Sequence, residues 1–294
     1  MVAAAVVAMV IGLLLPSPGG ASQLIDRNAK GVRLTVNAKG EALVSYRTGS
    51  NSRHVLAWGA INAIPPTRSR PQVAFKLDYA GGWGKYHRPY WRSVDGSCRP
   101  YDGPPLAWLV AACKAPDGSY WALQSWQRML PNYGAPPTPA QAAWELRLSH
   151  WTRNLPMLTI MTDWSWHQWD HLFGTFSYDG HPVFGFRSTA TGVPLDTFGR
   201  NIYVDTFNST YGVGWRRENS FLAHSGTGAF CYSFNPHGSH PAGKGSVYRA
   251  TVEGPGVTPD VLWQGRAPGS YDPDLDAAAN ELERGLDDRR CLPN

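Results

Sequence analysis

Apolar and polar residues alternate along most of this chain, and this period of two restricts its fold more than any other feature. Val32, Leu34 and Val36 alternate with polar neighbours, residues 37–40 form a turn, and the alternation resumes over residues 42–46. Such a period places one face of a strand on a core and the other face in water. The segment therefore predicts a β-hairpin.

The same signal recurs along the chain, with Gly, Pro and Asn between the apolar segments. The chain holds 31 Gly and 24 Pro, and only 17% of its residues are charged, as expected of a loop-rich protein. We predict an all-β antiparallel sandwich or jelly roll over residues 22–271. Further strands are expected at 73–79, 120–128, 142–151, 158–164, 172–178, 182–188, 201–206, 228–234 and 246–253. The proline-rich segment 131–141 leaves a second organisation open, with two lobes that divide there.

The N-terminal segment has the pattern of a secretory leader. Residues 2–15 are apolar, a run too short to span a bilayer comfortably, and Pro16 and Pro18 end it. We predict that residues 1–21 are a signal peptide cleaved before Ser22, and that the mature protein is secreted to the cell exterior without a membrane span. No Lys or Arg precedes the apolar run, so either the amino terminus alone supplies the positive charge or the true start codon lies upstream. The length of the run leaves an uncleaved membrane anchor as the alternative.

The C-terminal segment, residues 272–294, predicts a short helix and a tail. Asp272 is a suitable N-cap, and Pro273 occupies the first helical position. A helical period then gives one apolar stripe, made of Leu275, Ala278, Ala279, Leu282 and Leu286. We expect this stripe to pack on the β body.

Four cysteines lie in the predicted mature chain, an even number that suits an oxidising compartment. Of three possible pairings we favour Cys98 with Cys113, because two extended segments flank the turn between them, and hence Cys231 with Cys291. The pairing would tether the C-terminal helix to the β body. No Cys-x-x-Cys spacing is present, so we predict neither a thiolate metal site nor a cofactor.

Charge is unevenly distributed along the chain. The formal net charge is +5, but residues 272–294 carry seven acids and three Arg, so residues 22–271 carry a net +9. A basic exported chain attracts acidic polymers through its long-range field. We predict a monomer whose partner is a polysaccharide or an anionic polymer of the cell envelope, and not nucleic acid. A diffuse charge that only aids solubility is the alternative interpretation.

The segment from Asp163 to His171 concentrates three Trp, two Asp and two His in nine residues. Indole rings stack on sugar rings while nearby polar groups bind hydroxyls, so we predict a ligand-binding platform. Alternation puts His167, Trp169 and His171 on one face, which we expect to be exposed, and Trp164 and Trp166 on the other. Asp163 and Asp170 complete the predicted site. Along a strand the two His side chains lie about 13 Å apart, too far to share a metal.

Four residue patterns bear on further roles in catalysis or in binding. Asp163 and Asp170 would serve as a general acid and base if they faced each other across a cleft, with Glu218 as a further candidate. Arg216, beside Arg217, would clamp an acidic ligand group. His224-Ser225 lacks the spacing of a serine hydrolase, and residues 238–245 imitate a phosphate-binding loop but have Gly245 where Ser or Thr is needed.

Together these features favour a secreted, non-catalytic glycan-binding protein. The first alternative is a secreted glycoside hydrolase or lyase that uses paired carboxylates. The second is a structural or interaction β domain of the cell envelope.

Overall fold

The computed structural model describes most of the chain downstream of the predicted leader. The described residues are 22–65, 69–127, 143–152, 154–184, 186–188, 194–196, 201–224, 226–236 and 238–292. The predicted signal peptide, residues 1–21, and the predicted linker, residues 131–141, lie outside them. No helix among these described residues is long and apolar enough to cross a membrane.

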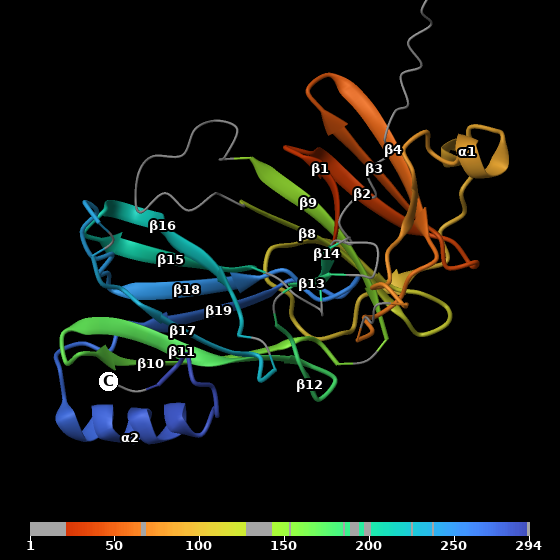
Figure 1. Ribbon diagram of the computed structural model, residues 1–294. Coiled ribbons are helices and arrows are strands. Elements are labelled where there is room, and N and C mark those ends of the chain that lie inside the picture. Colours follow the sequence, from red (N-terminus) through yellow and green to blue (C-terminus); the bar gives the residue numbers. More distant parts are fainter. Residues whose placement is uncertain are drawn as a thin grey trace, which may run out of the picture.

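Two antiparallel sheets form a first sandwich (Figure 1). One sheet has the order β2 (Lys30–Val36), β3 (Ala42–Thr48), β4 (Asn51–Trp58) and β5 (Lys76–Asp78). The other has the order β1 (Gln23–Arg27), β9 (Trp144–Trp151), β8 (Tyr120–Gln127), β7 (Leu109–Lys114) and β6 (Arg99–Pro100). Their alternating apolar residues share one core, which includes Val44, Val55, Trp121 and Leu148. The predicted hairpin at residues 32–46 is formed by β2 and β3.

Two further sheets form a second sandwich with a core of its own. One contains β10 (Met157–Ser165), β11 (Trp169–Tyr178), β12 (His181–Pro182) and β17 (Ala229–Ser233). The facing sheet has the order β16 (Gly212–Leu222), β15 (Asn201–Ser209), β18 (Val247–Val252) and β19 (Val261–Arg266). A small hairpin pairs β13 (Phe186–Ser188) with β14 (Pro194–Asp196). Leu172, Phe176, Val204 and Tyr248 are buried between the two large sheets. The predicted all-β antiparallel class is confirmed.

The change from the first core to the second falls between β9 and β10. The strands that flank the predicted linker, β8 and β9, pair with each other along their whole length in one sheet. Asp260, in the buried loop that joins β18 to β19, connects the two sandwiches, because it accepts hydrogen bonds from Ser22 Oγ and from Trp126 Nε1, the latter at 2.7 Å.

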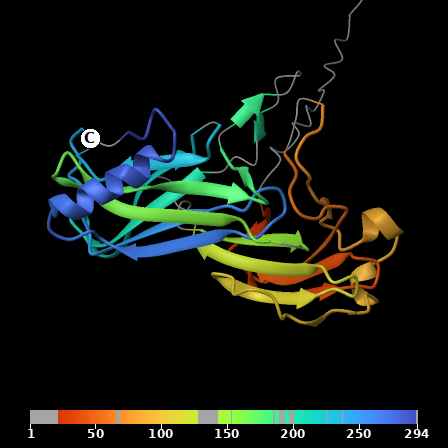
Figure 2. The ribbon, with the colours of Figure 1, turned by 90° about the horizontal axis from the view of Figure 1, so that it is seen from below.

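The described residues also form the helical segments α1 (Trp83–Tyr86), the 3₁₀ turn η1 (Tyr90–Arg92) and α2 (Pro273–Arg284). Asp272 caps α2 by accepting hydrogen bonds from the backbone of Asp274 and Leu275, as predicted. Figure 2 shows α2 lying across the outer side of β10 and β11.

The face that α2 turns inward differs from the expectation. Leu275 and Leu282 are 61% and 56% exposed, whereas Asp276, Asn280 and Glu283 are buried. Polar residues of β10 and β11 meet α2, so the helix presents its own polar side to them.

The predicted pairing of the cysteines is confirmed as Cys98–Cys113 and Cys231–Cys291. The first disulfide closes a sequence separation of 15 residues, and the second closes one of 60. The second ties the chain just after α2 to β17, which pairs with β11 in the second sandwich. This covalent bond adds to the polar contacts of α2 with the β10–β11 hairpin.

We predict that replacing Cys231 and Cys291 with Ser lowers the free energy of unfolding by about 4 kcal/mol, from the entropy of the longer loop. Replacing Cys98 and Cys113 should cost about 3 kcal/mol in the same chain-entropy treatment. Urea unfolding of both double variants measures the difference. Limited proteolysis should cut within residues 273–292 only in the first variant, and continued protection there would contradict the assigned role.

Candidate functional site

The β10–β11 hairpin divides the predicted platform between its two faces. Cross-strand neighbours share a face, and the register pairs Asp163 with His171 and Trp164 with Asp170. Asp163 therefore lies on the outer face under α2, while Asp170 points into the second sandwich. The two carboxylates do not face each other across a cleft, so they are not placed as an acid and base pair.

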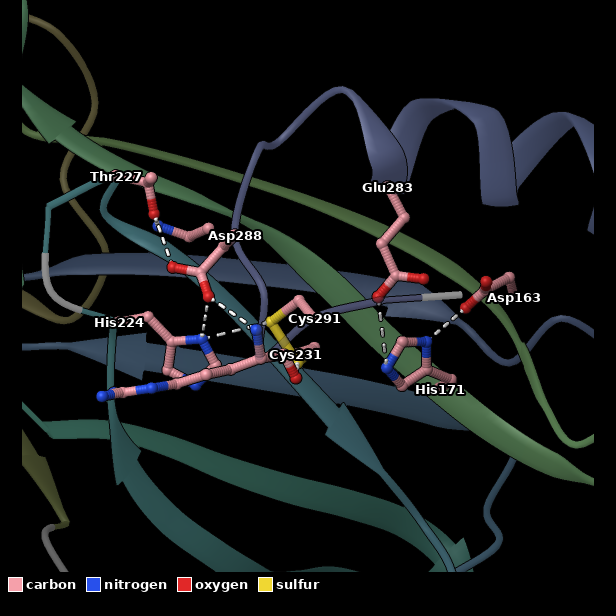
Figure 3. The surroundings of a disulfide bond; sticks show 10 residues. Asp163, His171, His224, Thr227, Cys231, Glu283, Asp288 and Cys291 are labelled. Atoms are coloured by element: carbon pink, nitrogen blue, oxygen red, sulfur yellow. Dashed lines mark hydrogen bonds and ion pairs between the residues drawn. A yellow bond between two sulfur atoms is a disulfide. The ribbon is translucent and has the colours of Figure 1, made fainter. Parts of the chain in front are cut away.

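On the outer face, His171 is buried between two acids (Figure 3). Its Nδ1 lies 2.7 Å from Asp163 Oδ1, and its Nε2 lies 3.9 Å from Glu283 Oε1. Burial raises the pKa of Glu283, and the neighbouring Asp163 adds to that rise while His171 opposes it. The expected exposure of His171 is wrong, because α2 covers this face. No sugar could reach the imidazole here without displacing the helix.

The segment that follows α2 carries Cys291 and lies beside the Cys231–Cys291 disulfide. His224 Nδ1 lies 3.5 Å from Cys291 Sγ and 3.1 Å from Asp288 Oδ1. Thr227 Oγ1 donates to the other oxygen of Asp288, at 2.9 Å. Within the described part of the chain, the two groups with metal-ligand spacing are His224, Cys231 and Cys291, and His171, Cys231 and Glu283. Both need sulfur atoms that the disulfide occupies.

On the inner face, Asp170 is a buried acid of the second sandwich. Tyr248 of the facing sheet donates its hydroxyl to Asp170 Oδ2. The ammonium group of Lys244 lies 3.8 Å from Asp170 Oδ1. Burial raises the pKa of Asp170, against the lowering effects of Tyr248 and Lys244.

Glu218 is a second acid in this interior, at an irregularity of β16. It is fully buried, and burial raises its pKa to about 7, although hydrogen bonds from Tyr232 and Tyr211 act in the opposite direction. Gly243 lies so close that a Cβ at this position would overlap Glu218 Oε2. The glycine-rich segment 238–245 is thus a loop from β17 to β18 that closes over Glu218. Gly243 and Gly245 are required by close packing, since a Cβ at either position would overlap Glu218 or Phe207.

Arg216 is half-buried on β16, opposite Thr206 of β15. Its neighbour Arg217 is buried and pairs with Asp205, which also accepts from Arg249 at 2.6 Å. Ser225 lies outside the described residues. Of these two arginines, Arg217 is therefore the one whose charge is paired inside the fold.

The exposed aromatic side chains of the predicted platform lie at the turn of the β10–β11 hairpin. Trp166 and His167 adopt positive φ values of 50° and 58°, a conformation that non-glycine residues rarely take. Trp166 is 58% exposed, and His167 packs on Tyr271 with ring centroids 4.9 Å apart. Tyr271 is itself 40% exposed, and Trp169 is half-buried. We call Trp166, His167, Trp169 and Tyr271 the hairpin surface.

No protein-family model, curated protein or solved structure matches this chain.

Several of the residues that build these sites have no local signal in the sequence. Tyr271 and Glu283 belong to the C-terminal segment and reach the hairpin only through the tertiary fold. Lys244 belongs to the glycine-rich segment 238–245, whose pattern imitates a phosphate-binding loop and does not indicate a contact with Asp170. Alternation also failed at Trp166, since a turn residue belongs to neither face of a strand.

The raised pKa of Glu218 predicts how stability depends on pH. The folded protein keeps a proton between pH 4.5 and about 7 that the unfolded chain releases, so the free energy of unfolding falls as pH rises through this window. The free energy of unfolding should fall by roughly 3 kcal/mol across this window, because each pKa unit corresponds to about 1.4 kcal/mol.

Urea unfolding at several pH values between 4.5 and 8 measures this slope. Glu218→Gln should flatten it, whereas Glu281→Gln, on the exposed side of α2, should leave it unchanged. Equal slopes for Glu218→Gln and the wild type would show that Glu218 ionises normally in the folded protein.

Proposed function

We propose that this protein is an exported, non-catalytic glycan-binding protein that contacts polysaccharide through the hairpin surface. The observation that carries the proposal is Trp166, a large apolar side chain held in water at a left-handed backbone position. Asn and Gly are the residues that favour such a turn, and a non-glycine residue costs about 1 to 2 kcal/mol there. Neither packing nor turn stability accounts for an indole at this position. Strain of this kind gathers at functional sites.

The composition of the hairpin surface supports a sugar as its ligand. Indole and phenol rings offer flat apolar faces, and His167 adds a hydrogen-bonding group beside them. The surface lies on a hairpin whose base is fixed in the second sandwich, so its rings are presented by a rigid element. Two disulfides also suit the extracellular setting that the leader predicts.

The charge of the residues near the hairpin surface favours one class of polysaccharide as the ligand. Tyr271 stands directly before Asp272 and Asp274, which begin α2, and the whole segment 272–294 carries a net charge of −4. Like charges repel, so an acidic polymer is disfavoured at this end of the molecule. The proposed ligand is an uncharged, hydroxyl-rich polysaccharide.

Trp166→Gly tests the hairpin surface with little risk to folding. Glycine relieves the left-handed strain, so the melting temperature should stay the same or rise. Binding to an uncharged polysaccharide should weaken by about 1 to 3 kcal/mol, the usual effect of removing an aromatic contact. Calorimetric titration with soluble neutral glucans and xylans measures the affinity.

Trp144→Ala is the matched control for that experiment. Trp144 is 49% exposed at the start of β9, in the first sandwich, and contributes nothing to the hairpin surface. Its variant should bind as the wild type does. Equal affinity of Trp166→Gly and the wild type for every glycan that binds would refute the role of the hairpin surface.

A further experiment separates the binder from the hydrolase alternative. Asp170 and Glu218 lie near Tyr248 in the second sandwich, but both are buried beneath the loop 238–245. We expect no release of reducing ends from any glycan that the wild type binds. Turnover that disappears in both Asp170→Asn and Glu218→Gln, with binding retained, would replace the proposal by a glycoside hydrolase.

A further inference from the structure

A second aromatic surface lies on the first sandwich, on the segment Tyr79–Arg92 that follows β5. This segment contains α1 and η1 and lies at the end of the molecule opposite to α2 (Figure 1). Tyr79 and Trp83 are 58% and 54% exposed on it. From residue 79 to residue 94 the chain carries three cationic side chains, Lys85, Arg88 and Arg92, between the acids Asp78 and Asp95.

The segment is a built structure whose two ends are packed together. A Cβ on Gly81 would lie 2.8 Å from Trp91 Cδ1, and one on Gly82 would lie 2.6 Å from Tyr90 Cβ. Both glycines also have positive φ values, of 66° and 97°. The backbone of Trp91 donates to Gly81 O at 3.0 Å. Only glycine allows this close return, which fixes the loop.

A buried polar cluster anchors the same segment to the sheet. Glu41 accepts hydrogen bonds from Lys85 Nζ at 2.5 Å and from the Tyr86 hydroxyl at 2.6 Å. Asn37 Nδ2 donates to Glu41 at 2.6 Å and to the Tyr90 hydroxyl at 2.9 Å. Glu41 therefore neutralises Lys85, and its pKa is lowered by these hydrogen bonds in spite of its burial.

The remaining cations are left exposed among the rings. The Arg92 guanidinium lies 4.9 Å from the centroid of Trp91, and that of Arg88 lies 5.6 Å from the centroid of Tyr90. Trp91 also stacks on His54, with centroids 4.1 Å apart, and burial lowers the pKa of His54, which keeps that ring neutral. Arg88 and Arg92 make no ion pair with any residue that the structure describes. Ring contacts orient their side chains while the charges stay available.

We propose that the segment Tyr79–Arg92 is a second binding site, specific for an anionic polysaccharide such as a polyuronate. Trp83 and Tyr79 supply ring faces for pyranose units, and the two guanidinium groups suit carboxylates at bidentate geometry. Binding to an anionic membrane typically uses clusters of about four to eight cations, and binding to nucleic acid strengthens with each phosphate that a cation neutralises. The two exposed guanidinium groups therefore favour a polysaccharide over either of these partners.

This site is independent of the hairpin surface and takes the opposite class of ligand. The hairpin surface borders an acidic helix, whereas this segment is basic and lies on the other sandwich. The net charge of +9 over residues 22–271 adds a field that favours an acidic polymer here. The segment therefore provides a specific place for the anionic partner that the composition predicts.

The test is binding of polygalacturonate, measured by calorimetry at low and at physiological salt. Replacing both Arg88 and Arg92 with Gln should weaken binding at least tenfold, and Trp83→Ala should weaken it about 5- to 150-fold. The charge-matched control replaces Arg289 and Arg290 with Gln. Both are exposed on the segment that follows α2, beside the second sandwich, and their loss should change affinity less than twofold.

Each outcome either supports or overturns the site. Equal losses in the control and in the Arg88, Arg92 variant would assign the binding to diffuse charge and overturn it. Tighter binding of phosphatidylglycerol vesicles or of single-stranded DNA than of polygalacturonate would overturn the ligand class. Trp166→Gly should leave polygalacturonate binding unchanged, so failure of the hairpin surface and failure of this site give different results.

Discussion

One buried carboxylate, that of Asp260, fixes how the two sandwiches are joined. The backbone N–H of Asp260 donates to Gln124 Oε1 at 2.9 Å, and Gln124 Nε2 donates a hydrogen bond to Asp260 O at 3.1 Å. Arg147 supplies a buried counter-charge and holds Glu145 and Glu253, each at 2.7 Å. Removing one member of such a network leaves an uncompensated buried charge, at a cost of about 3 to 5 kcal/mol. The joint is specific because its buried polar partners must all be present together.

The same preference for polar contacts appears where α2 meets the second sandwich. A helix usually docks through an apolar stripe, but here Asp163 and His171 of the hairpin meet Glu283 of the helix. The Cys231–Cys291 bond adds a covalent tie just after the helix ends. Before the helix begins, the ring of Tyr271 contacts Trp164 and His167, and Gly269 O accepts a hydrogen bond from Trp164 Nε1. The segment that leads into the helix thereby supports the exposed hairpin surface.

Local patterns predicted much of the fold, and contacts between distant segments set most of the rest. Alternation, the Asp272 cap and the spacing of the cysteines are short-range signals, and the structure agrees with each of them. The burial of His171 depends on a helix more than a hundred residues away, so no window around His171 contains it. The inward face of α2 was predicted wrongly for the same reason, since the polarity of its partner decides which side docks. The exposed turn at Trp166 interrupts the alternation on which the face assignment rested.

The rigid joint has a consequence for the two proposed surfaces. The β10–β11 hairpin starts beside the first sandwich and turns at the far end of the second, while the segment Tyr79–Arg92 lies at the far end of the first (Figure 1). Buried hydrogen bonds at Asp260 hold the two sandwiches together, and this contact sets the distance between the two surfaces. Simultaneous engagement then raises avidity only for polymers long enough to reach both ends, or for two polymers that lie side by side. A molecule with one neutral and one acidic specificity on a fixed frame is thus suited to joining unlike polysaccharides rather than to gripping a single short chain.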